Sequence, residues 1–235
     1  MRDYWGFPAI LETFKATGYG KIQNIDGLEW RVRGGDYVLL TPPQELFTVP
    51  EEANPSRIRS LCFLEGTLGE EIPAKAGSNT WMYGIGDDWE PNKKGRYALR
   101  QAERAGACLM TPSPEQTLEV FTEWLRWAKT RKDMVVRGHY EQMITHPGFT
   151  FLGTQVDGEV ISVCGFTQEG EDSAIAFAKH REGPWWVARH MWVTALLRLL
   201  ESGATSINCG DTADKLKQQL GLKKFRQSRV DFSQL

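Results

Sequence analysis

A strand, a glycine-containing loop and a helix follow one another in the stretch Ser173–Ser202, SAIAFAKHREGPWWVARHMWVTALLRLLES. Its first part, Ser173–Lys179, is β-prone. Gly183 and Pro184 then interrupt the strand pattern and favour the start of a helix. The apolar residues that follow recur at helical spacing and end before Gly203; they are Ala188, Met191, Trp192, Ala195, Leu196 and Leu199. The stretch therefore predicts a strand packed against a helix in a domain that mixes the two.

The elements before this unit are also predicted by local pattern. Two strands, Phe149–Gln155 and Val160–Thr167, flank an Asp-Gly pair, which is a strong hairpin signal. A helix begins after Ser113, whose hydroxyl can cap it, and Pro114 suits its first position. An earlier helix covers Lys93–Ala105 and ends at Gly106, and a strand, Ala107–Thr111, lies between the two helices.

The elements after the unit are shorter. We expect a strand at Thr205–Cys209, a helix from a cap at Asp211 to Leu220, and a last strand at Phe225–Phe232. The whole second half is thus a mixed α/β (α+β) arrangement.

The first part of the chain is rich in short β-prone runs, with a helix predicted at Pro8–Thr17. The Gly34-Gly35-Asp36 turn between two of these runs predicts a hairpin. The runs are Leu28–Arg33, Tyr37–Thr41, Arg57–Leu64 and Thr80–Gly84. We therefore expect a strand-rich lobe over 1–92 and a second lobe over 93–235.

Composition sets outer limits on function. The 235 residues include 41% hydrophobic and 25% charged residues, typical of a globular protein, and charges interrupt every long apolar run. The start of the chain shows no leader pattern, so we expect a cytoplasmic protein without a transmembrane segment. The four cysteines are widely spaced, which disfavours a zinc cage or a disulfide scaffold; they are Cys62, Cys108, Cys164 and Cys209. The net charge of -2 means that any polyanion would bind through a local patch.

Catalytic motifs of several enzyme classes are missing from the sequence. It has no Ser/His/Asp elbow, no Walker loop, no HExxH and no other metal-spaced cluster. The sequence therefore disfavours hydrolases, NTPases and metalloenzymes, and we expect no metal.

The order of elements over 107–235 resembles the GNAT acyltransferase fold, a mixed central sheet flanked by helices. The block Gly95–Gly106, GRYALRQAERAG, resembles the R-x-x-L-R-x-A-E-x-x-G stretch of FemAB-like transferases and of the C-terminal domain of phosphatidylglycerol lysyltransferases. Those families pair two GNAT-like lobes. The resemblance therefore implies that the strand-rich first part is an incomplete second lobe.

The resemblance also implies a reaction: transfer of an acyl or aminoacyl group from a carrier to an amine, by direct attack. The usual carrier in this fold is an acyl-CoA such as acetyl-CoA, which we expect here, whereas the FemAB and lysyltransferase groups use aminoacyl-tRNA. Both donors stay open, as does a non-catalytic binding module of the same fold. The acceptor would be an amine of a small molecule or macromolecule.

Donor-binding candidates cluster around the loop that opens the helix. His180–Gly183 occupies the position of the GNAT phosphate loop, and helix N-termini attract anions. Pro184 lacks an N–H, and Trp185 stands where a small residue is usual, so an ordinary helix entry is the alternative. The candidates are Ala178, Lys179, His180, Arg181, Gly183 and Trp185.

Arginines at helical spacing form a second candidate donor site. Arg96, Arg100 and Arg104 lie on neighbouring positions of one helix face, where guanidinium groups can hold phosphates of a cofactor or of tRNA. A solvated charged face is the alternative.

Candidate catalytic residues fall in two places. His139, Tyr140 and Glu141 precede the Phe149 strand, in a segment that borders the acceptor site in GNAT-like folds, and His or Glu there could deprotonate the amine. A loop with an exposed imidazole is the alternative. Cys209 could protonate the leaving group and Asp211 could orient the amine; a buried thiol and a helix cap are the alternatives.

Overall fold

The computed structural model describes residues 4–18, 20–40, 58–60, 63–64, 79–128, 134–210 and 214–229. Its elements, in chain order, are η1 (Tyr4–Gly6), α1 (Pro8–Lys15), β1 (Lys21–Ile25), β2 (Leu28–Arg33), β3 (Asp36–Leu39), β4 (Ile58–Ser60), β5 (Phe63–Leu64), β6 (Asn79–Gly86), α2 (Lys93–Arg104), β7 (Cys108–Met110), α3 (Pro114–Trp127), α4 (Met134–Thr145), β8 (Thr150–Val156), β9 (Glu159–Glu169), β10 (Asp172–His180), α5 (Trp186–Glu201), β11 (Ser206–Asn208), α6 (Asp214–Gln219) and β12 (Lys223–Arg229).

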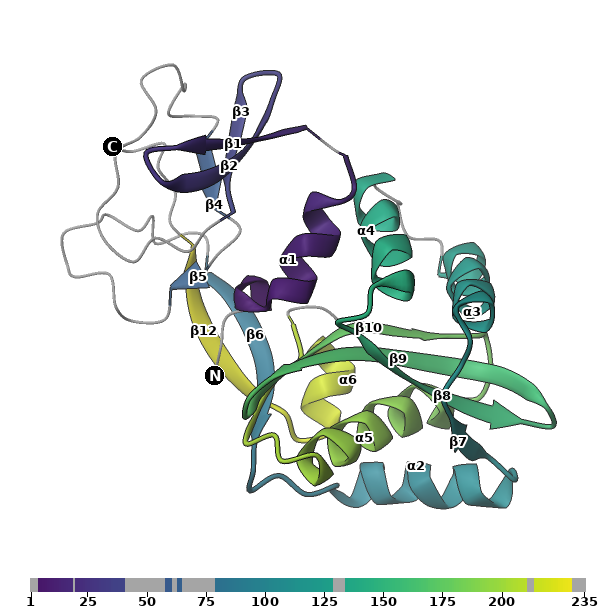
Figure 1. The fold of residues 1–235 in the computed structure, drawn as a ribbon. Coiled ribbons are helices and arrows are strands. Elements are labelled where there is room, and N and C mark those ends of the chain that lie inside the picture. Colours follow the sequence, from purple (N-terminus) through teal and green to yellow (C-terminus); the bar gives the residue numbers. More distant parts are fainter. Residues whose placement is uncertain are drawn as a thin grey trace.

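The strands form two sheets (Figure 1). The larger one is mixed, with the order β5-β12-β6-β11-β10-β9-β8-β7, and β10 runs parallel to β11. The smaller sheet has the order β1-β2-β3-β4 and is antiparallel from β1 to β3. The predicted mixed central sheet is therefore confirmed, and a separate small sheet accompanies it.

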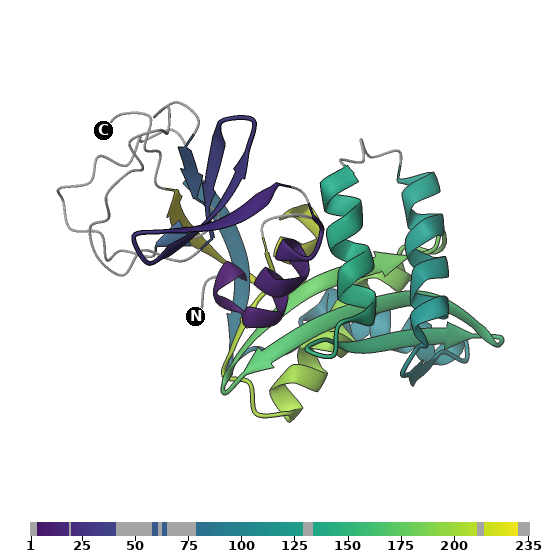
Figure 2. The same cartoon turned by 45° about the horizontal axis from the view of Figure 1, so that its top comes forward.

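Helices cover both faces of the large sheet (Figure 2). α1, α3 and α4 lie on one face, where Phe121 of α3 packs against Phe177 of β10. α5 lies on the other face, and its Leu196 belongs to a buried cluster that also contains Tyr83 of β6. The sheet is thus the middle of three layers, and burial of apolar side chains on both of its faces holds the layers together.

Small residues bring α2 close to α5. Ala98 and Ala102 of α2 are buried against Trp186 and Val187 of α5. A Cβ added to Gly95 would lie 3.2 Å from Cγ2 of Val193. This close approach turns the rest of α2, with its charged residues, toward solvent.

Several predicted elements are confirmed. The hairpin at Asp157-Gly158 forms with φ of 50° and 85°, and the Gly34-Gly35 turn has φ of 55° and 85°. Both turns need positive φ, which glycine adopts without strain. The predicted cap at Ser113 is a full capping box, in which its hydroxyl accepts from Gln116 N and the Gln116 side chain accepts from Ser113 N.

Other local predictions were wrong or incomplete. The predicted strand Arg57–Leu64 is two strands, β4 and β5, which belong to different sheets. β1 and α4 were not predicted, because β1 is almost wholly exposed and α4 has a weak apolar stripe.

The predicted lobe boundary between residues 92 and 93 stays a prediction. Strand β6, which precedes this boundary, pairs with β11 and β12 in the large sheet. None of the described helices combines the length and the apolar character that a membrane span requires.

Candidate functional site

β10 and β11 separate after a short stretch of pairing. They are paired from Asp172–Ser206 to Ala174–Asn208, whereas β10 continues to His180. On its other side β11 pairs with β6, and the chain stays beside β6 after Asn208, since Cys209 N donates to Tyr83 O at 2.7 Å. Among the described strands, none pairs with this side of β10 beyond Ala174.

A β-bulge lies at the point of separation. Ile175 and Phe177 of β10 face consecutive residues of β9, so that Ala176 is the extra residue. A bulge re-aims backbone groups and side chains locally. Within the described part of the chain, the separation and the bulge leave this edge of β10 without a partner strand beyond Ala174, and we take this edge as the candidate donor opening.

The loop after β10 differs from a glycine-rich phosphate cradle. Trp185 occupies the cap position of α5 and makes no side-chain capping bond. Val187 N, an early donor of the helix, is already bonded to Pro184 O at 3.1 Å. Gly183 has open space around it, and its nearest neighbour, Arg181 O, lies 4.0 Å from an ideal Cβ. The loop therefore offers an anion fewer free N–H groups than a regular helix start does.

Arg181 is held by β9 and α3. Its backbone N donates to Ile161 O and its Nε to Val160 O, each at 2.8 Å. The rest of the guanidinium contacts the carboxylates of Glu123 and Glu119, the latter at 3.6 Å. Arg181 is thus paired with acidic groups, and it would have to leave them to bind a phosphate.

Lys179 is buried between β10, α3 and α4. Its ammonium lies 4.0 Å from the centre of the Trp124 ring and 4.2 Å from that of Tyr140. None of the described carboxylates forms an ion pair with it, and burial lowers the pKa of Lys179 to about 8. On the same strand, Ala178 packs toward α5, and His180 accepts through its carbonyl a bond from Trp127 Nε1 at 3.1 Å. Burial also lowers the pKa of His180.

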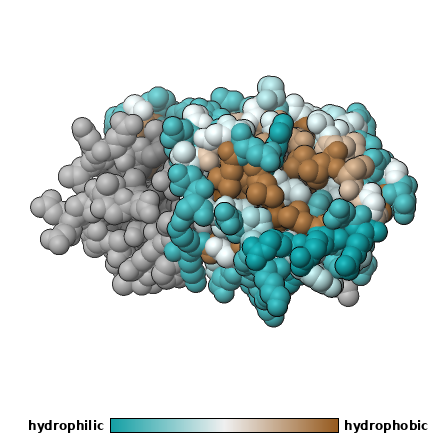
Figure 3. Space-filling model, turned by 90° about the horizontal axis from the view of Figure 1, so that it is seen from below, coloured by the Kyte–Doolittle hydropathy of each residue, from teal (hydrophilic) through white to brown (hydrophobic). Residues whose placement is uncertain are grey.

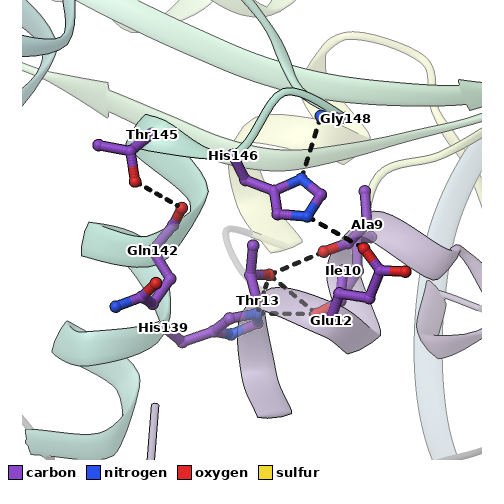
Figure 4. Close-up of polar contacts among 9 residues, drawn as sticks. All are labelled: Ala9, Ile10, Glu12, Thr13, His139, Gln142, Thr145, His146 and Gly148. Atoms are coloured by element: carbon purple, nitrogen blue, oxygen red, sulfur yellow. Dashed lines mark hydrogen bonds and ion pairs between the residues drawn. The ribbon is translucent and has the colours of Figure 1, made fainter. Parts of the chain in front are cut away.

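His139 connects α4 to α1. It lies inside a helix with its side chain buried, so the alternative of a loop with an exposed imidazole is wrong. Its Nε2 lies 3.2 Å from Ile10 O and 3.1 Å from Thr13 Oγ1 (Figure 4). The Ile10 carbonyl oxygen can only accept, so Nε2–H is the donor in this contact. The Thr13 hydroxyl lies within donating distance of both Ala9 O and Ile10 O, each at 2.9 Å.

The chemistry of His139 follows from this burial, which lowers its pKa to about 4. Its ring also stacks on Trp5, with centroids 5.7 Å apart. The imidazole is therefore neutral at pH 7 and has one nitrogen committed to α1. Its predicted role as a base stays a prediction, but the observed contacts suit a helix-joining residue.

Tyr140 and Glu141 point in different directions from the same helix. Tyr140 is half-buried between Phe121 and Phe177, edge-on to both rings. Glu141 is half-exposed and accepts a hydrogen bond from Arg137 Nε at 2.8 Å. The structure thus brings Tyr140 to Lys179, whereas it leaves Glu141 on the outer side of α4.

Cys209 lies at the end of β11 and is buried. Burial raises its pKa to about 12, although the nearby Lys217 acts in the opposite direction. Lys217 of α6 donates to Cys209 O and, at 2.9 Å, to Gly210 O. The thiol therefore keeps its proton at neutral pH. Asp211 lies outside the described residues.

Arg100 lies on α2, on the side of the molecule that faces away from the sheet, and its side chain is exposed. It is therefore not part of the opening between β10 and β11.

Next to Arg100 the structure shows an aromatic pair that the sequence did not predict. Tyr97 of α2 and Trp185 stack with ring centroids 5.4 Å apart and an angle of 3°. Their exposure, 44% and 48%, is high for large aromatic residues, but sequence alone gives no signal that they meet.

Comparison by sequence finds no matching family profile and no matching curated protein. Comparison by structure finds similar folds in solved structures. FemX has a TM-score of 0.67 at 11% identity, covering 97% of this chain and 92% of that one. The C-terminal domain (DUF2156) of a putative lysylphosphatidylglycerol synthetase from Agrobacterium fabrum has 0.62 at 12%, covering 96% and 89%. L-PGS from Bacillus licheniformis has 0.61 at 12%, covering 95% and 90%.

The chain has the GNAT-like fold of these proteins. The resemblance that the element order and the Gly95–Gly106 block indicate is thus confirmed at the level of the fold. At this identity, similarity concerns architecture, and function has to be argued from the site.

Proposed function

We propose that this protein is an acyl or aminoacyl transferase that moves its group from a carrier ester or thioester to an amine. The observation that carries the proposal is the separation of β10 from β11 after Ala174, with the bulge at Ala176 beside it. This opening lies in a fold shared with FemX and with a lysylphosphatidylglycerol synthetase domain, whose name describes an aminoacyl product.

The proposed reaction needs no covalent enzyme intermediate. The amine nitrogen attacks the carbonyl carbon, the C–N bond forms, and the C–O or C–S bond to the carrier breaks. Backbone N–H groups of β10 beyond Ala174 stabilise the oxyanion that develops. The amine proton passes to a base, and the carrier oxygen or sulfur takes up a proton as it leaves.

The protein groups that move protons are part of the proposal. Tyr140 and Glu141 stay candidates for the acceptor side, together with His139. Because the pKa of His139 is about 4, its imidazole is a weak base. Cys209 and Asp211 stay candidates for the leaving-group side, but a thiol with a pKa of about 12 is a weak proton donor.

A binding module without catalytic activity is the second candidate function. Arg181 is paired with Glu119 and Glu123, and Pro184 and Trp185 stand in the phosphate loop. These features disfavour tight binding of a CoA pyrophosphate. They therefore suit a binding module that keeps the opening of the fold but has no catalytic activity.

The test offers the purified chain two carriers, labelled acetyl-CoA and a pool of aminoacyl-tRNA, together with small amines as acceptors. We expect transfer from at least one carrier and a rise in Tm with that carrier, because a ligand of the folded state stabilises it. Absence of both transfer and thermal shift with every carrier would contradict the proposal. A thermal shift without transfer would support the binding module.

Two variants test the loop assignment. If Arg181 holds carrier phosphates, Arg181→Ala weakens the thermal shift, whereas Glu123→Gln, which releases the guanidinium, preserves or strengthens it. If Arg181 is only a link between β10 and α3, both variants lower Tm without carrier and leave the carrier-induced shift unchanged.

A further inference from the structure

Lys179 lies beside the candidate donor opening. It belongs to the part of β10 that has no partner strand on the β11 side within the described parts of the chain. It follows Phe177, which borders the bulge at Ala176, by two residues. Side chains two residues apart on a strand point to the same face, about 7 Å from each other. The Lys179 ammonium lies 5.9 Å from the centre of the Phe177 ring, so it is next to the edge of β10 that we take as the opening.

The face to which Lys179 points is the one that α3 and α4 cover. Its ammonium lies 4.0 Å from the centre of the Trp124 ring of α3 and 4.2 Å from that of Tyr140 of α4. The opposite face is covered by α5, on which α2 packs. Figure 3, which looks onto that opposite side of the molecule, shows strongly hydrophilic surface beside apolar surface. An acceptor amine would therefore reach Lys179 from the side of α3 and α4.

Lys179 differs from Lys217, which is also buried. Lys217 donates hydrogen bonds to Cys209 O and, at 2.9 Å, to Gly210 O, so backbone carbonyls compensate its charge. Among the described residues, no carbonyl, carboxylate or hydroxyl accepts a hydrogen bond from Lys179 Nζ. Aromatic faces attract a cation, but they do not take its proton. A buried lysine with a purely structural role is expected to be paired as Lys217 is, whereas the amine of Lys179 is left to exchange its proton with a ligand.

Burial sets the charge of Lys179. It lowers the pKa of the ammonium to about 8, and the Cys164 thiol acts in the opposite direction. Burial raises the pKa of Cys164, so that thiol stays protonated. About one Lys179 in ten is therefore neutral at pH 7. The titratable or charged groups that face Lys179 or the residues next to it are Cys164 of β9, Glu119 and Glu123 of α3, which contact Arg181, Tyr140 of α4, and His180 and Arg181 of its own strand and loop.

We propose that Lys179 is the catalytic base of the transfer: its neutral amine takes the proton of the acceptor nitrogen, and the rings of Trp124 and Tyr140 hold the ammonium that forms. The acceptor nitrogen attacks the carbonyl carbon, the C–N bond forms, and the bond from carbon to the carrier oxygen or sulfur breaks. The proton on Lys179 then passes to the departing oxygen or sulfur, which returns the amine to its neutral form. This inference rests on the proposed function and names the group that moves its proton.

The other candidates for this role are less suited to it. His139 has a pKa of about 4 and one nitrogen committed to Ile10 O. Glu141 accepts a hydrogen bond from Arg137 on the outer side of α4. A base is most effective when its pKa lies near the working pH, because it is then both available and strong enough to take the proton. Lys179 meets this condition and lies next to the opening.

The test compares Lys179→Met and Lys179→Arg with the wild type, using the carrier and the amine that give the fastest transfer. Methionine keeps the volume of the side chain but has no basic group, and arginine keeps the charge but does not release its proton. We expect both variants to lower kcat by about 10²- to 10⁴-fold, the usual contribution of a general base, with little change in KM. Lys223→Met is the matched control, because the Lys223 side chain is 62% exposed and paired with Asp88; it should keep the wild-type kcat.

The pH dependence of kcat separates a base from a lysine that acts only through its charge or its packing. In the wild type kcat should rise with pH and level off above about 8, because only the neutral amine takes a proton. This rise should keep its position when the acceptor is exchanged for an amine of different basicity, and Lys179→Met should lack it. A rise that moves with the acceptor, or full activity of Lys179→Arg, would overturn the inference.

A chemical measurement checks Lys179 without the transfer assay. Trace acetylation by acetic anhydride at pH 7, 8, 9 and 10, read by peptide mass spectrometry, should label Lys179 to an extent that levels off above about pH 8. Bound carrier should protect it. If the folded protein is not labelled at Lys179 at any of these pH values, the inference fails, because a base has to contact the amine that it deprotonates.

Failure of the inference is distinct from failure of the proposed function. Wild-type transfer by Lys179→Met refutes the base and leaves the transferase standing. Absence of transfer by the wild type with every carrier refutes the transferase, and the base with it. Circular dichroism and Tm check the fold of each variant, and Lys179→Met decides alone if the larger arginine does not fit.

Discussion

The ammonium of Lys179 lies 4.0 Å from the centre of the Trp124 ring, inside the layer between β10 and α3. Aromatic faces attract a cation, but they do not replace the hydration that burial removes. This explains why the pKa of Lys179 is lowered to about 8 while the residue is still accommodated in the core.

Replacing Lys179 with methionine should be neutral or stabilising at pH 7, because it removes a buried charge and keeps the volume. The folded chain binds its Lys179 proton less tightly than the unfolded chain. The wild type should therefore gain stability as pH rises from about 8 to 10.5, by up to about 3 kcal/mol, and the variant should lack this gain. Urea unfolding at pH 7, 8, 9 and 10 measures both. A difference between the two proteins that does not vary with pH would refute the explanation.

Two buried histidines should make the protein sensitive to acid. Burial lowers the pKa of His139 and of His190 to about 4 from 6.5, so each is neutral in the folded chain and must be charged in the unfolded one at pH 5. Stability should therefore fall as pH drops from about 6.5 to 4, by up to about 3 kcal/mol per residue. Unfolding free energies at pH 7, 6, 5 and 4.5 test this.

Matched variants separate the two residues. His139→Gln keeps a nitrogen near Ile10 O, and His190→Asn keeps a polar atom near Thr154, whose Oγ1 lies 3.1 Å from His190 Nδ1. Each should remove about half of the acid sensitivity. If both variants show the full pH dependence of the wild type, other groups are responsible.

The capping box of α3 should contribute measurably to stability. Ser113→Ala removes the acceptor for Gln116 N, bonded at 3.2 Å, and should lower the unfolding free energy by about 1 kcal/mol. Gln116→Ala removes the reciprocal bond to Ser113 N. Because the two bonds fix the same turn, the double variant should cost less than the sum of the single ones, as a double-mutant cycle in urea will show.

Gly165 should tolerate no side chain. An added Cβ would lie 2.5 Å from Cε1 of Phe151, whose ring covers this glycine across the β8–β9 pair. Gly165→Ala should cost about 1–3 kcal/mol by overpacking. Gly183→Ala is the control, since its nearest neighbour is 4.0 Å from the ideal Cβ. Equal Tm values for the two variants would show that Phe151 moves away without cost.

Much of the fold follows from local sequence. Some features depend only on residues that are close in the sequence, so they can be predicted without a structure. These are the Ser113 cap, the Asp157-Gly158 turn and the apolar spacing of α5. α4 was missed because its residues alternate between burial against α1 and contact with α3, which blurs a single stripe. The split between β4 and β5 depends on partners far away in the chain.

The sequence by itself determined the order of strands, turns and helices in Ser173–Ser202 and around it, because propensity, capping and periodicity are properties of neighbouring residues. Tertiary structure decided what the candidate residues do. It buried His139 against Ile10, paired Arg181 with Glu123, enclosed Lys179 between rings and joined Tyr97 to Trp185. These contacts join residues from different elements, so burial and partners, which set pKa and access, arise only when the layers pack.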